Sequence, residues 1–501
     1  MQAELNELKA RLADVTALRG AAAVLHWDQA THMPPGGNAA RGRQLAVVQQ
    51  AAHERATDGR IGELLETLTG AVDDLPEDSD DRALVTVATR DYVRQARVPD
   101  AFVARFADHT AQSYEAWQKA REANDFSIAL PFLQTNLEMS REYAGFFPDA
   151  AHLADPLIDA SDPGMTVAAL VPLFDDLRAR LVPLVEEVTA APEPAWAFLT
   201  AEYPREQQLA FGTSVIRRFG YDFDRGRQDL THHPFCTSFS VGDVRITTRV
   251  REHDLTEALF STLHEAGHGL YEQGIDPVLD GTPLAEGASS GLHEAQSRLW
   301  ENLVGRSRPF WDALYPELVE TFPEQLRGVD PDTFLRAVNR VGRSLIRTDA
   351  DELTYNLHVM MRFDFELALL DGSLAAKELP EAWGERIFGD LGVRPEDHNT
   401  GVLQDVHWFV DFVGGAFQGY TLGNVISAQL FQAARRAHPG IEAEIARGEF
   451  STLRAWLTDN VYRHGRKYPA ADVVERATGA PIGIDPYLTY LEDKYRRLYR
   501  L

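Results

Sequence analysis

Apolar residues recur at helical spacing along most of the chain. Two clear stretches have apolar positions at Leu5, Leu8, Leu12, Val15 and Leu18, and at Leu255, Ala258, Leu259, Leu263 and Ala266. Residues three and four apart lie on one face of a helix, so both stretches predict amphipathic helices. Strand patterns are scarce outside residues 235–250, and no internal repeat is present. We therefore expect a mainly α-helical protein.

One short segment alternates with the period of a β-strand. In residues 243–249, Val244, Ile246 and Thr248 fall on one side. We expect a single small sheet in this part of the chain.

Length and turn signals predict two portions. The 501 residues can bury a large core, and alanine and proline cluster at residues 190–194, which we interpret as a hinge or a linker. We predict a helical N-terminal portion over residues 1–200 and a second portion, with the motifs described below, over residues 201–501.

Charge and cysteine content argue against several classes of partner. The net charge is −27 and the pI is near 5.0, whereas nucleic acid and anionic membranes require a positive protein surface. Cys236 is the only cysteine, which fits a reducing compartment without disulfides. No basic and apolar leader opens the sequence, and no stretch approaches about 18 apolar residues. We expect a cytoplasmic protein that binds neither nucleic acid nor membrane.

The central predicted helix contains the pattern His-Glu-x-x-His at His264, Glu265 and His268. The two histidines fall one turn apart on one face, where both can bind one metal ion, and the glutamate can act on a water molecule held by that ion. Gly267 and Gly269 are unfavourable inside a helix and are tolerated where a backbone or ligand comes close. A surface helix with two histidines aligned by chance would have the same pentapeptide.

A catalytic zinc ion normally takes three protein ligands, so a third ligand should follow the motif. Residues 271–290 are rich in Gly, Asp, Pro and Ser and predict a loop. Residues 291–305 predict a second helix, which Ser289 or Ser290 can cap.

Three carboxylates are candidates for the third ligand. Glu286 lies in the predicted loop, and Glu294 and Glu301 lie seven residues apart on one face of the second helix. A downstream His-x-x-Gly-x-x-His extension is absent, which favours a carboxylate over a third histidine. Spacing alone does not choose among the three. His293 is a further candidate, although a histidine at such a position is more often a helix-surface residue than a metal ligand.

Residues 293–298, His-Glu-Ala-Gln-Ser-Arg, resemble a block of the carboxypeptidase Taq family of zinc metallocarboxypeptidases. Five further segments resemble blocks of that family in the right order: Trp27 to Gly37, His233-Pro-Phe235, Asp243-Val-Arg-Ile-Thr247, Ile346-Arg-Thr-Asp-Ala-Asp351, and Gly401 to Trp408. The resemblance spans nearly the whole chain. It implies a large two-lobed helical metallopeptidase in which portion 1–200 covers a deep cleft and packs with portion 201–501 as one body. It also implies a small β-sheet beside the zinc helix, and a homodimer.

The resemblance also assigns the metal site. It implies that the zinc ligands are His264, His268 and Glu294. Glu286 and Glu301 then have supporting or structural roles, and Glu265 is the general base that takes a proton from water and returns it to the departing amine. Ligand types do not separate Zn²⁺ from Co²⁺, so we expect zinc, replaceable by cobalt.

Arg347 lies in the block at residues 346–351. A carboxypeptidase needs a fixed cation for the terminal carboxylate of its substrate, and a guanidinium can bind a carboxylate through two parallel hydrogen bonds. The resemblance points to Arg347 for this role. Without it, the same segment would be interpreted as a structural ion pair of Arg347 with Asp349 or Asp351.

His407 and Tyr420 are predicted catalytic residues that would donate hydrogen bonds to the oxyanion of the tetrahedral intermediate. Many family members have Phe-Gly-Tyr-Phe-Pro-Thr-Tyr after the block of His407. This chain has Val-Gly-Gly-Ala-Phe-Gln-Gly-Tyr at residues 413–420, which lacks the first tyrosine and differs in length. Tyr420 is equally well interpreted as a buried aromatic residue in a turn before a helix over residues 422–434.

His233 and Arg245 are predicted to bind the substrate. His233 belongs to the block His-Pro-Phe, which without the resemblance indicates only a turn with a packed aromatic ring. Arg245 lies on the predicted strand, which could pair with an extended peptide.

These observations predict a zinc-dependent carboxypeptidase that removes residues from peptides with a free C-terminus, with broad specificity and poor action on terminal proline. One alternative is an oligopeptidase or dipeptidyl carboxypeptidase of the same zinc clan. Another is a non-catalytic, peptide-binding helical protein. Glu265 argues against the last, because a structural zinc site has no use for a base.

Overall fold

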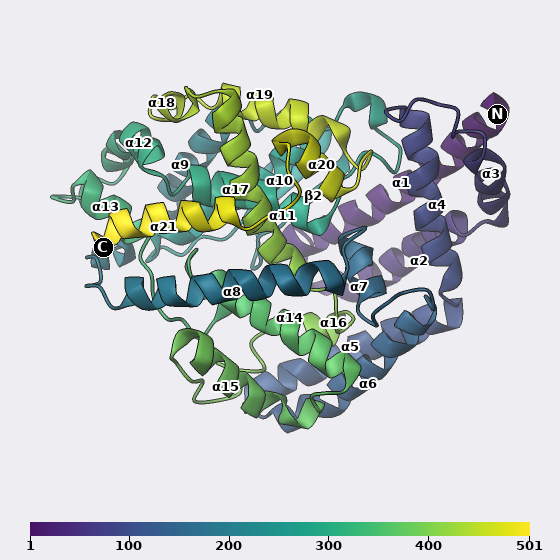
Figure 1. The fold of residues 1–501 in the computed structure, drawn as a ribbon, viewed down its shortest axis with the longest axis horizontal. Coiled ribbons are helices and arrows are strands. Elements are labelled where there is room, and N and C mark those ends of the chain that lie inside the picture. The colour runs from purple at the N-terminus through teal and green to yellow at the C-terminus, as the bar shows by residue number, and fades with distance from the viewer.

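Helices dominate the computed structural model, which describes residues 1–501 (Figure 1). The helices before residue 200 are α1 (Gln2–Thr31), α2 (Asn38–Ala56), α3 (Gly59–Thr69), α4 (Asp80–Arg97), α5 (Asp100–Ala123), α6 (Phe126–Gly145), α7 (Asp155–Ser161) and α8 (Val167–Thr189). Those in the middle of the chain are α9 (Arg205–Phe219), α10 (Leu255–Gly274), α11 (Ser290–Arg298), α12 (Arg308–Thr321), α13 (Pro331–Val338), α14 (Tyr355–Asp371) and α15 (Leu379–Leu391). The last are α16 (His407–Val410), α17 (Gln418–Ala437), α18 (Ile441–Ile445), α19 (Ser451–Asn460), α20 (Ala470–Thr478) and α21 (Asp485–Tyr499). The expectation of a mainly helical protein is confirmed.

The strands form one sheet of three, β1 (Gln228–Leu230), β2 (Cys236–Ser240) and β3 (Asp243–Thr248). The strand β3 lies in the middle, parallel to β1 and antiparallel to β2. Val244, Ile246 and Thr248 are all buried, as the alternating pattern predicted. The sheet packs against α10, where the Thr248 hydroxyl donates to the carbonyl of Ala258. The predicted small sheet is therefore confirmed, and it lies beside the helix with the His-Glu-x-x-His motif.

Two hydrophobic cores hold the elements together. The larger has 98 buried residues between Phe102 and Tyr499. The smaller, of 17 residues, joins α1, α3 and α4 to three apolar side chains that follow α10, namely Ile275, Leu279 and Leu284. Helices on both sides of residue 200 contribute to the larger core, and the boundary between portions 1–200 and 201–501 stays a prediction.

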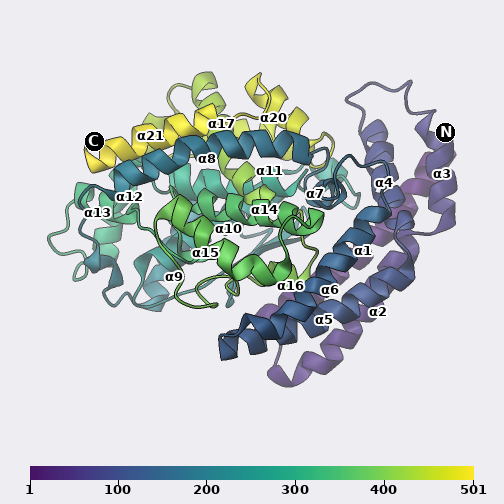
Figure 2. The ribbon, with the colours of Figure 1, turned by 60° about the horizontal axis from the view of Figure 1, so that its bottom comes forward.

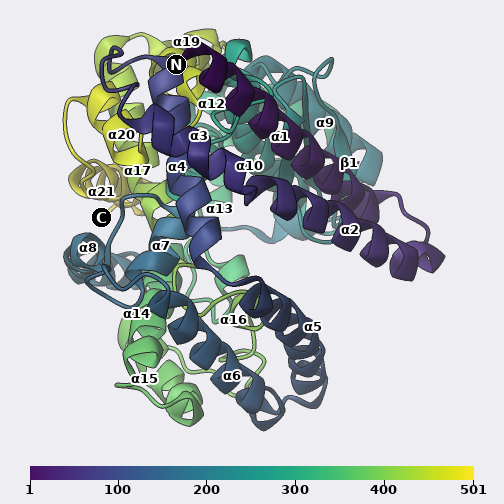
Figure 3. The same cartoon turned by 90° about the vertical axis from the view of Figure 1, so that its right-hand side faces the viewer.

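Figure 3 shows the two lobes. The helices α5, α6, α14 and α15 gather in one lobe, and α1, α3, α4, α10 and α17 lie in the other. In Figure 2 the helices α1, α2, α5 and α6 follow one side of the molecule, while α8 and α21, which pack together, cross another side. A cavity of about 1150 Å³ opens beside α10 and α11. The predicted two-lobed architecture with a cleft is confirmed.

Two predicted boundaries are wrong. The segment 271–290 does not begin as a loop, because α10 continues to Gly274 with Tyr271 fully buried against the ring of Tyr462. The helix expected over residues 422–434 already begins at Gln418, so Tyr420 lies in its first turn. Tertiary packing extended both helices beyond the positions where glycine-rich sequence indicated a turn.

Candidate active site

The helices α10 and α11 can approach closely because Gly267 has no side chain. A Cβ atom at Gly267 would lie 2.6 Å from the carbonyl oxygen of Gln296 and 2.6 Å from the Cα of Ser297. The side chain of Asp254 caps α10 and that of Ser289 caps α11, as predicted for the second helix. The close contact brings the polar face of each helix to the same cavity.

Three candidate ligand atoms meet where these helices cross. Nε2 of His264 lies 3.6 Å, and Nε2 of His268 lies 3.5 Å, from Oε2 of Glu294. All three atoms lie within 4.8 Å of one another. A tetrahedral zinc ion with bonds of about 2.0–2.2 Å needs ligand atoms about 3.3–3.6 Å apart. The residues present therefore fit one ion of this size and chemistry.

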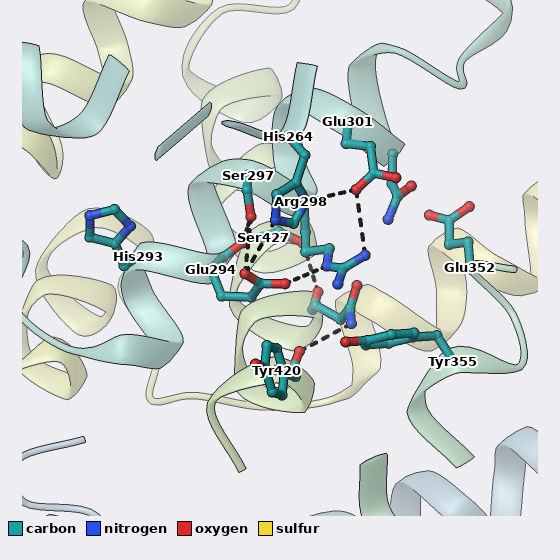
Figure 4. Close-up of polar contacts among 12 residues, drawn as sticks. His264, His293, Glu294, Ser297, Arg298, Glu301, Glu352, Tyr355, Tyr420 and Ser427 are labelled. Atoms are coloured by element: carbon teal, nitrogen blue, oxygen red, sulfur yellow. Dashed lines mark hydrogen bonds and ion pairs between the residues drawn. The ribbon is translucent and has the colours of Figure 1, made fainter. Parts of the chain in front are cut away.

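Side chains of α11 and of the π-helical turn that follows it, Leu299–Val304, hold the remaining polar atoms of His264 and Glu294 (Figure 4). Glu301 accepts a hydrogen bond from Nδ1 of His264 at 2.9 Å. Arg298 donates to Oε1 of Glu294 at 2.6 Å and to Oε2 of Glu301 at 3.4 Å. These contacts leave Nε2 of His264 and Oε2 of Glu294 directed at the shared site.

Burial controls the protonation of the cluster. Loss of solvent lowers the pKa of His268 to about 3, so its imidazole is neutral, as a metal ligand must be. Burial alone would raise the pKa of Glu294, but the charges of Arg298 and His264 hold it well below its usual value. The pKa of Glu301 is lowered to about 2, since its hydrogen bond with His264 and the charge of Arg298 outweigh burial.

Glu265 lies in the same cavity and is 6% exposed. Burial raises its pKa to about 7, although the neighbouring His264 opposes this shift. A carboxyl group with a pKa near neutrality can both accept a proton and return it. Glu265 and Glu294 therefore differ in protonation: the raised pKa of Glu265 allows proton exchange, whereas the lowered pKa of Glu294 keeps it ionised.

Arg347 lines the cavity and is bound by Asp405. Nε and Nη2 of Arg347 lie 3.0 and 2.8 Å from Oδ1 of Asp405, and its Nη1 donates to the hydroxyl of Tyr355 at 3.1 Å. The sequence-based alternative of a pair with Asp349 or Asp351 is wrong. Asp351 instead accepts hydrogen bonds from backbone N–H groups that follow it, which keeps it away from the guanidinium.

Tyr420 lines the cavity, and His407 lies behind it. The Tyr420 hydroxyl is 3.5 Å from Nε2 of His407, and the guanidinium carbon of Arg347 is 5.4 Å from the Tyr420 ring centre. Burial lowers the pKa of His407 to about 4 and opposes the effect of Asp405, so the imidazole is neutral. The tyrosine and the arginine thus share one wall of the cavity.

Comparison with known proteins decides the family. The profile of the carboxypeptidase Taq (M32) metallopeptidases matches residues 7–495. The chain belongs to the carboxypeptidase Taq family. Carboxypeptidase 1 of Bacillus subtilis (strain 168) is 37% identical over 483 residues, which cover 96% of this chain and 96% of that protein. Thermostable carboxypeptidase 1 of Thermus thermophilus is 40% identical over 489 residues, or 95% of both chains.

Solved structures of carboxypeptidase Taq enzymes share the fold. The crystal structure of an M32 carboxypeptidase from Deinococcus radiodurans R1 is 49% identical, has a TM-score of 0.97 and covers 100% of both chains. The apo-Mg structure of the Pyrococcus furiosus carboxypeptidase has a TM-score of 0.95 at 31% identity, and covers 98% of this chain and 99% of that one. The protein is accordingly a metallocarboxypeptidase, and the resemblance found in its motifs is confirmed.

Two predicted substrate-binding residues of this carboxypeptidase Taq enzyme lie away from the cavity wall. Arg245 forms a forked ion pair with Asp243 and stacks on Trp27, with its guanidinium carbon 4.2 Å from the ring centre. His233 is exposed, whereas the three residues that follow it, Pro234 to Cys236, line the cavity. The block around His233 thus reaches the cavity through its neighbours.

Sequence reasoning missed some polar residues of the site in this family member. Arg298 lies four residues after Glu294 on α11, and that spacing was a usable signal for their contact. Tyr355 had no such signal. Glu286, one of the carboxylates left open, lies near Arg466 with its side chain 54% exposed. No helix of the enzyme has the length and apolar character needed to cross a membrane.

Proposed function

We propose that the protein is a zinc-dependent carboxypeptidase in which His264, His268 and Glu294 hold the metal ion. The donor set supports this, because two imidazole nitrogens and one carboxylate oxygen converge at the spacing zinc requires. A bound zinc ion would polarise the scissile carbonyl and lower the pKa of a water molecule from 15.7 toward about 7. Cobalt fits the same donors, so we propose that Co²⁺ can replace Zn²⁺.

Glu265 is the general base and then the general acid of the proposed reaction. It takes a proton from the attacking water and passes it to the departing amine, which a pKa of about 7 allows in both directions. Tyr420 donates a hydrogen bond to the oxyanion of the tetrahedral intermediate, with His407 orienting its hydroxyl.

Arg347 receives the terminal carboxylate of the peptide. Of its five N–H groups, those of Nε and Nη2 that face Asp405 and one on Nη1 that faces Tyr355 are occupied. One hydrogen on each terminal nitrogen stays free, and these two can bind a carboxylate side by side. The observation that carries the exopeptidase proposal is that Arg347 and Glu265 line one cavity.

Two finer points follow from the chemistry of the substrate and the chain. Terminal proline is proposed to be a poor substrate, since its amide nitrogen lacks a hydrogen and its ring fixes φ. The single free cysteine supports a reducing, cytoplasmic location.

We also propose that the protein is a homodimer, as the family resemblance implies. Sedimentation analysis would test this.

The proposal is tested by offering one peptide as free acid and as C-terminal amide, with zinc and after chelation, and following the products by mass spectrometry. We expect stepwise loss of single residues from the acid only, abolished by the chelator. Arg347→Ala should remove the preference for the acid, and Glu265→Gln should be inactive with full metal content. Arg343→Ala is the matched control, because Arg343 lines the same cavity but donates to Thr189.

Other outcomes would favour other functions. Internal cleavage of both peptides, or release of dipeptides, would identify an oligopeptidase or dipeptidyl carboxypeptidase. Failure to cleave either peptide while zinc is bound would favour the alternative that the protein binds peptides without catalysis.

A further inference from the structure

His293 is placed between a proposed metal ligand and a buried carboxylate. Its Nδ1 lies 2.6 Å from Nδ1 of His268, and its Nε2 lies 2.8 Å from Oε1 of Glu272. Glu272 is 6% exposed and belongs to the last turns of α10. The histidine is therefore no free helix-surface residue, which was the commoner interpretation of its sequence position.

The two contacts fix where the hydrogens lie. Between the two Nδ1 atoms there is room for one hydrogen, so one ring donates and the other accepts. The carboxylate of Glu272 can only accept, so Nε2 of His293 has the hydrogen and its Nδ1 is the acceptor. Nδ1 of His268 must then be the donor, which leaves the lone pair on its Nε2, the atom that faces Glu294.

The loop before α11 is shaped around the His293 ring. The N–H of Gly287 donates to Oε1 of Glu272 at 3.1 Å, and the N–H of Ala288 donates to the hydroxyl of Tyr271 at 3.1 Å. A Cβ atom at Gly287 would lie 2.5 Å from Cδ2 of His293 and 3.1 Å from the Tyr271 ring. Glycine at this position therefore makes room for the imidazole, and the loop closes against it.

We propose that His293 and Glu272 are positioning residues that hold His268 in the tautomer and ring orientation required of a metal ligand. The inference rests on the proposed metal site. The two proposed histidine ligands are then oriented by different partners. His264 hydrogen-bonds directly to the carboxylate of Glu301, whereas His268 is linked to the carboxylate of Glu272 through the imidazole of His293. Partners of this kind typically change metal affinity about 10–100-fold when they are removed.

The test measures zinc affinity of the full-length protein by competition with a chromogenic chelator, without substrate. His293→Leu removes the acceptor and should weaken zinc binding about 10–100-fold. His293→Asn keeps an acceptor oxygen near the position of Nδ1 and should recover most of the affinity. Gly287→Ala keeps every polar group, but its Cβ would clash with the imidazole ring of His293. This variant should therefore weaken zinc binding as well.

Control measurements distinguish a failure of the positioning role of His293 from a failure of the proposed metal site. Glu286→Gln changes a carboxylate next to Gly287 that has no contact with His293, and its zinc affinity should equal that of the wild type. Circular dichroism of each metal-free variant reports folding, and the Co²⁺ absorption spectrum reports the ligand field, which a purely structural role would leave unaltered. If the wild type binds no zinc, the proposed function fails. If the wild type binds zinc and His293→Leu and Gly287→Ala both match it, the positioning role alone is refuted.

Discussion

Arg347 and Asp405 form an ion pair in which two guanidinium nitrogens, Nε at 3.0 Å and Nη2 at 2.8 Å, share one carboxylate oxygen. The other oxygen of Asp405 accepts from Nε of Arg362 at 2.5 Å, and Arg362 is fully buried. One carboxylate therefore neutralises two buried cations and fixes the orientation of the arginine proposed to bind the substrate.

Asp405→Asn should lower both stability and substrate affinity. Removing one partner of a buried ion pair costs about 3–5 kcal/mol, because the remaining charge stays buried without compensation. We expect a lower urea midpoint and a raised KM for free-acid peptides, with a smaller change in kcat. Asp349→Asn is the matched control, since Asp349 is an exposed carboxylate of the same cavity that does not pair with Arg347. Equal KM values for the two variants would contradict the anchoring role.

Glu366 should make the free energy of unfolding depend on pH. It is fully buried, and its Oε1 accepts from the indole of Trp408 at 3.0 Å. Burial raises its pKa from 4.5 to about 8, so the folded state binds the proton more tightly than the unfolded state. The stabilising contribution is complete below pH 4.5 and is lost as the pH rises through about 8.

Glu366→Gln keeps the hydrogen bond to Trp408 and has no ionisable group. Relative to the wild type, the variant should gain about 2–5 kcal/mol between pH 4.5 and pH 8. Urea unfolding at pH 5, 7 and 9 measures this difference, with exposed Glu381→Gln as the control. Parallel stability curves for wild type and Glu366→Gln would show that the carboxyl group is ionised in the folded protein.

Gly267→Ala should separate α10 from α11. Its Cβ would lie 2.6 Å from backbone atoms of Gln296 and Ser297, which cannot move aside like a side chain. We expect a loss of stability of about 1–3 kcal/mol and weaker zinc binding, as for overpacking in a core. Gly384→Ala in α15 is the control, because a Cβ there meets nothing within 4 Å and should stabilise the protein by about 0.4–1 kcal/mol.

Local spacing explains what the sequence could predict. Helical periodicity placed His264 and His268 on one face, and alternation placed Val244 and Ile246 on the buried side of β3. Gly267 was predicted to allow a close approach, and the contact with α11 confirms it. The family and the enzyme class could be predicted as well, because six short blocks stood in the right order.

Contacts between distant segments could not be predicted. The partner of Arg347 is Asp405, 58 residues away, whereas sequence reasoning could offer only the neighbours Asp349 and Asp351. The pairing of His293 with His268 depends on the angle between α10 and α11, and no spacing encodes that angle. Glu301 lies in a π-helical turn, Leu299–Val304, whose altered register places it near Nδ1 of His264.

Tyr420 and Tyr355 should affect different kinetic constants although both line the cavity with Arg347. Tyr420→Phe removes the hydroxyl proposed to stabilise the oxyanion, a group bound only in the transition state, so kcat should fall about 10²–10³-fold with KM nearly unchanged. Tyr355→Phe removes a hydrogen bond that holds Nη1 of Arg347, so KM for free-acid peptides should rise instead.

His407→Gln acts only through Tyr420 and should lower kcat less than Tyr420→Phe does. Steady-state kinetics on one acylated dipeptide separates these effects, with zinc content measured for each variant. A fall in kcat for Tyr355→Phe as large as that for Tyr420→Phe would mean that the two hydroxyls do not divide binding and catalysis in this way.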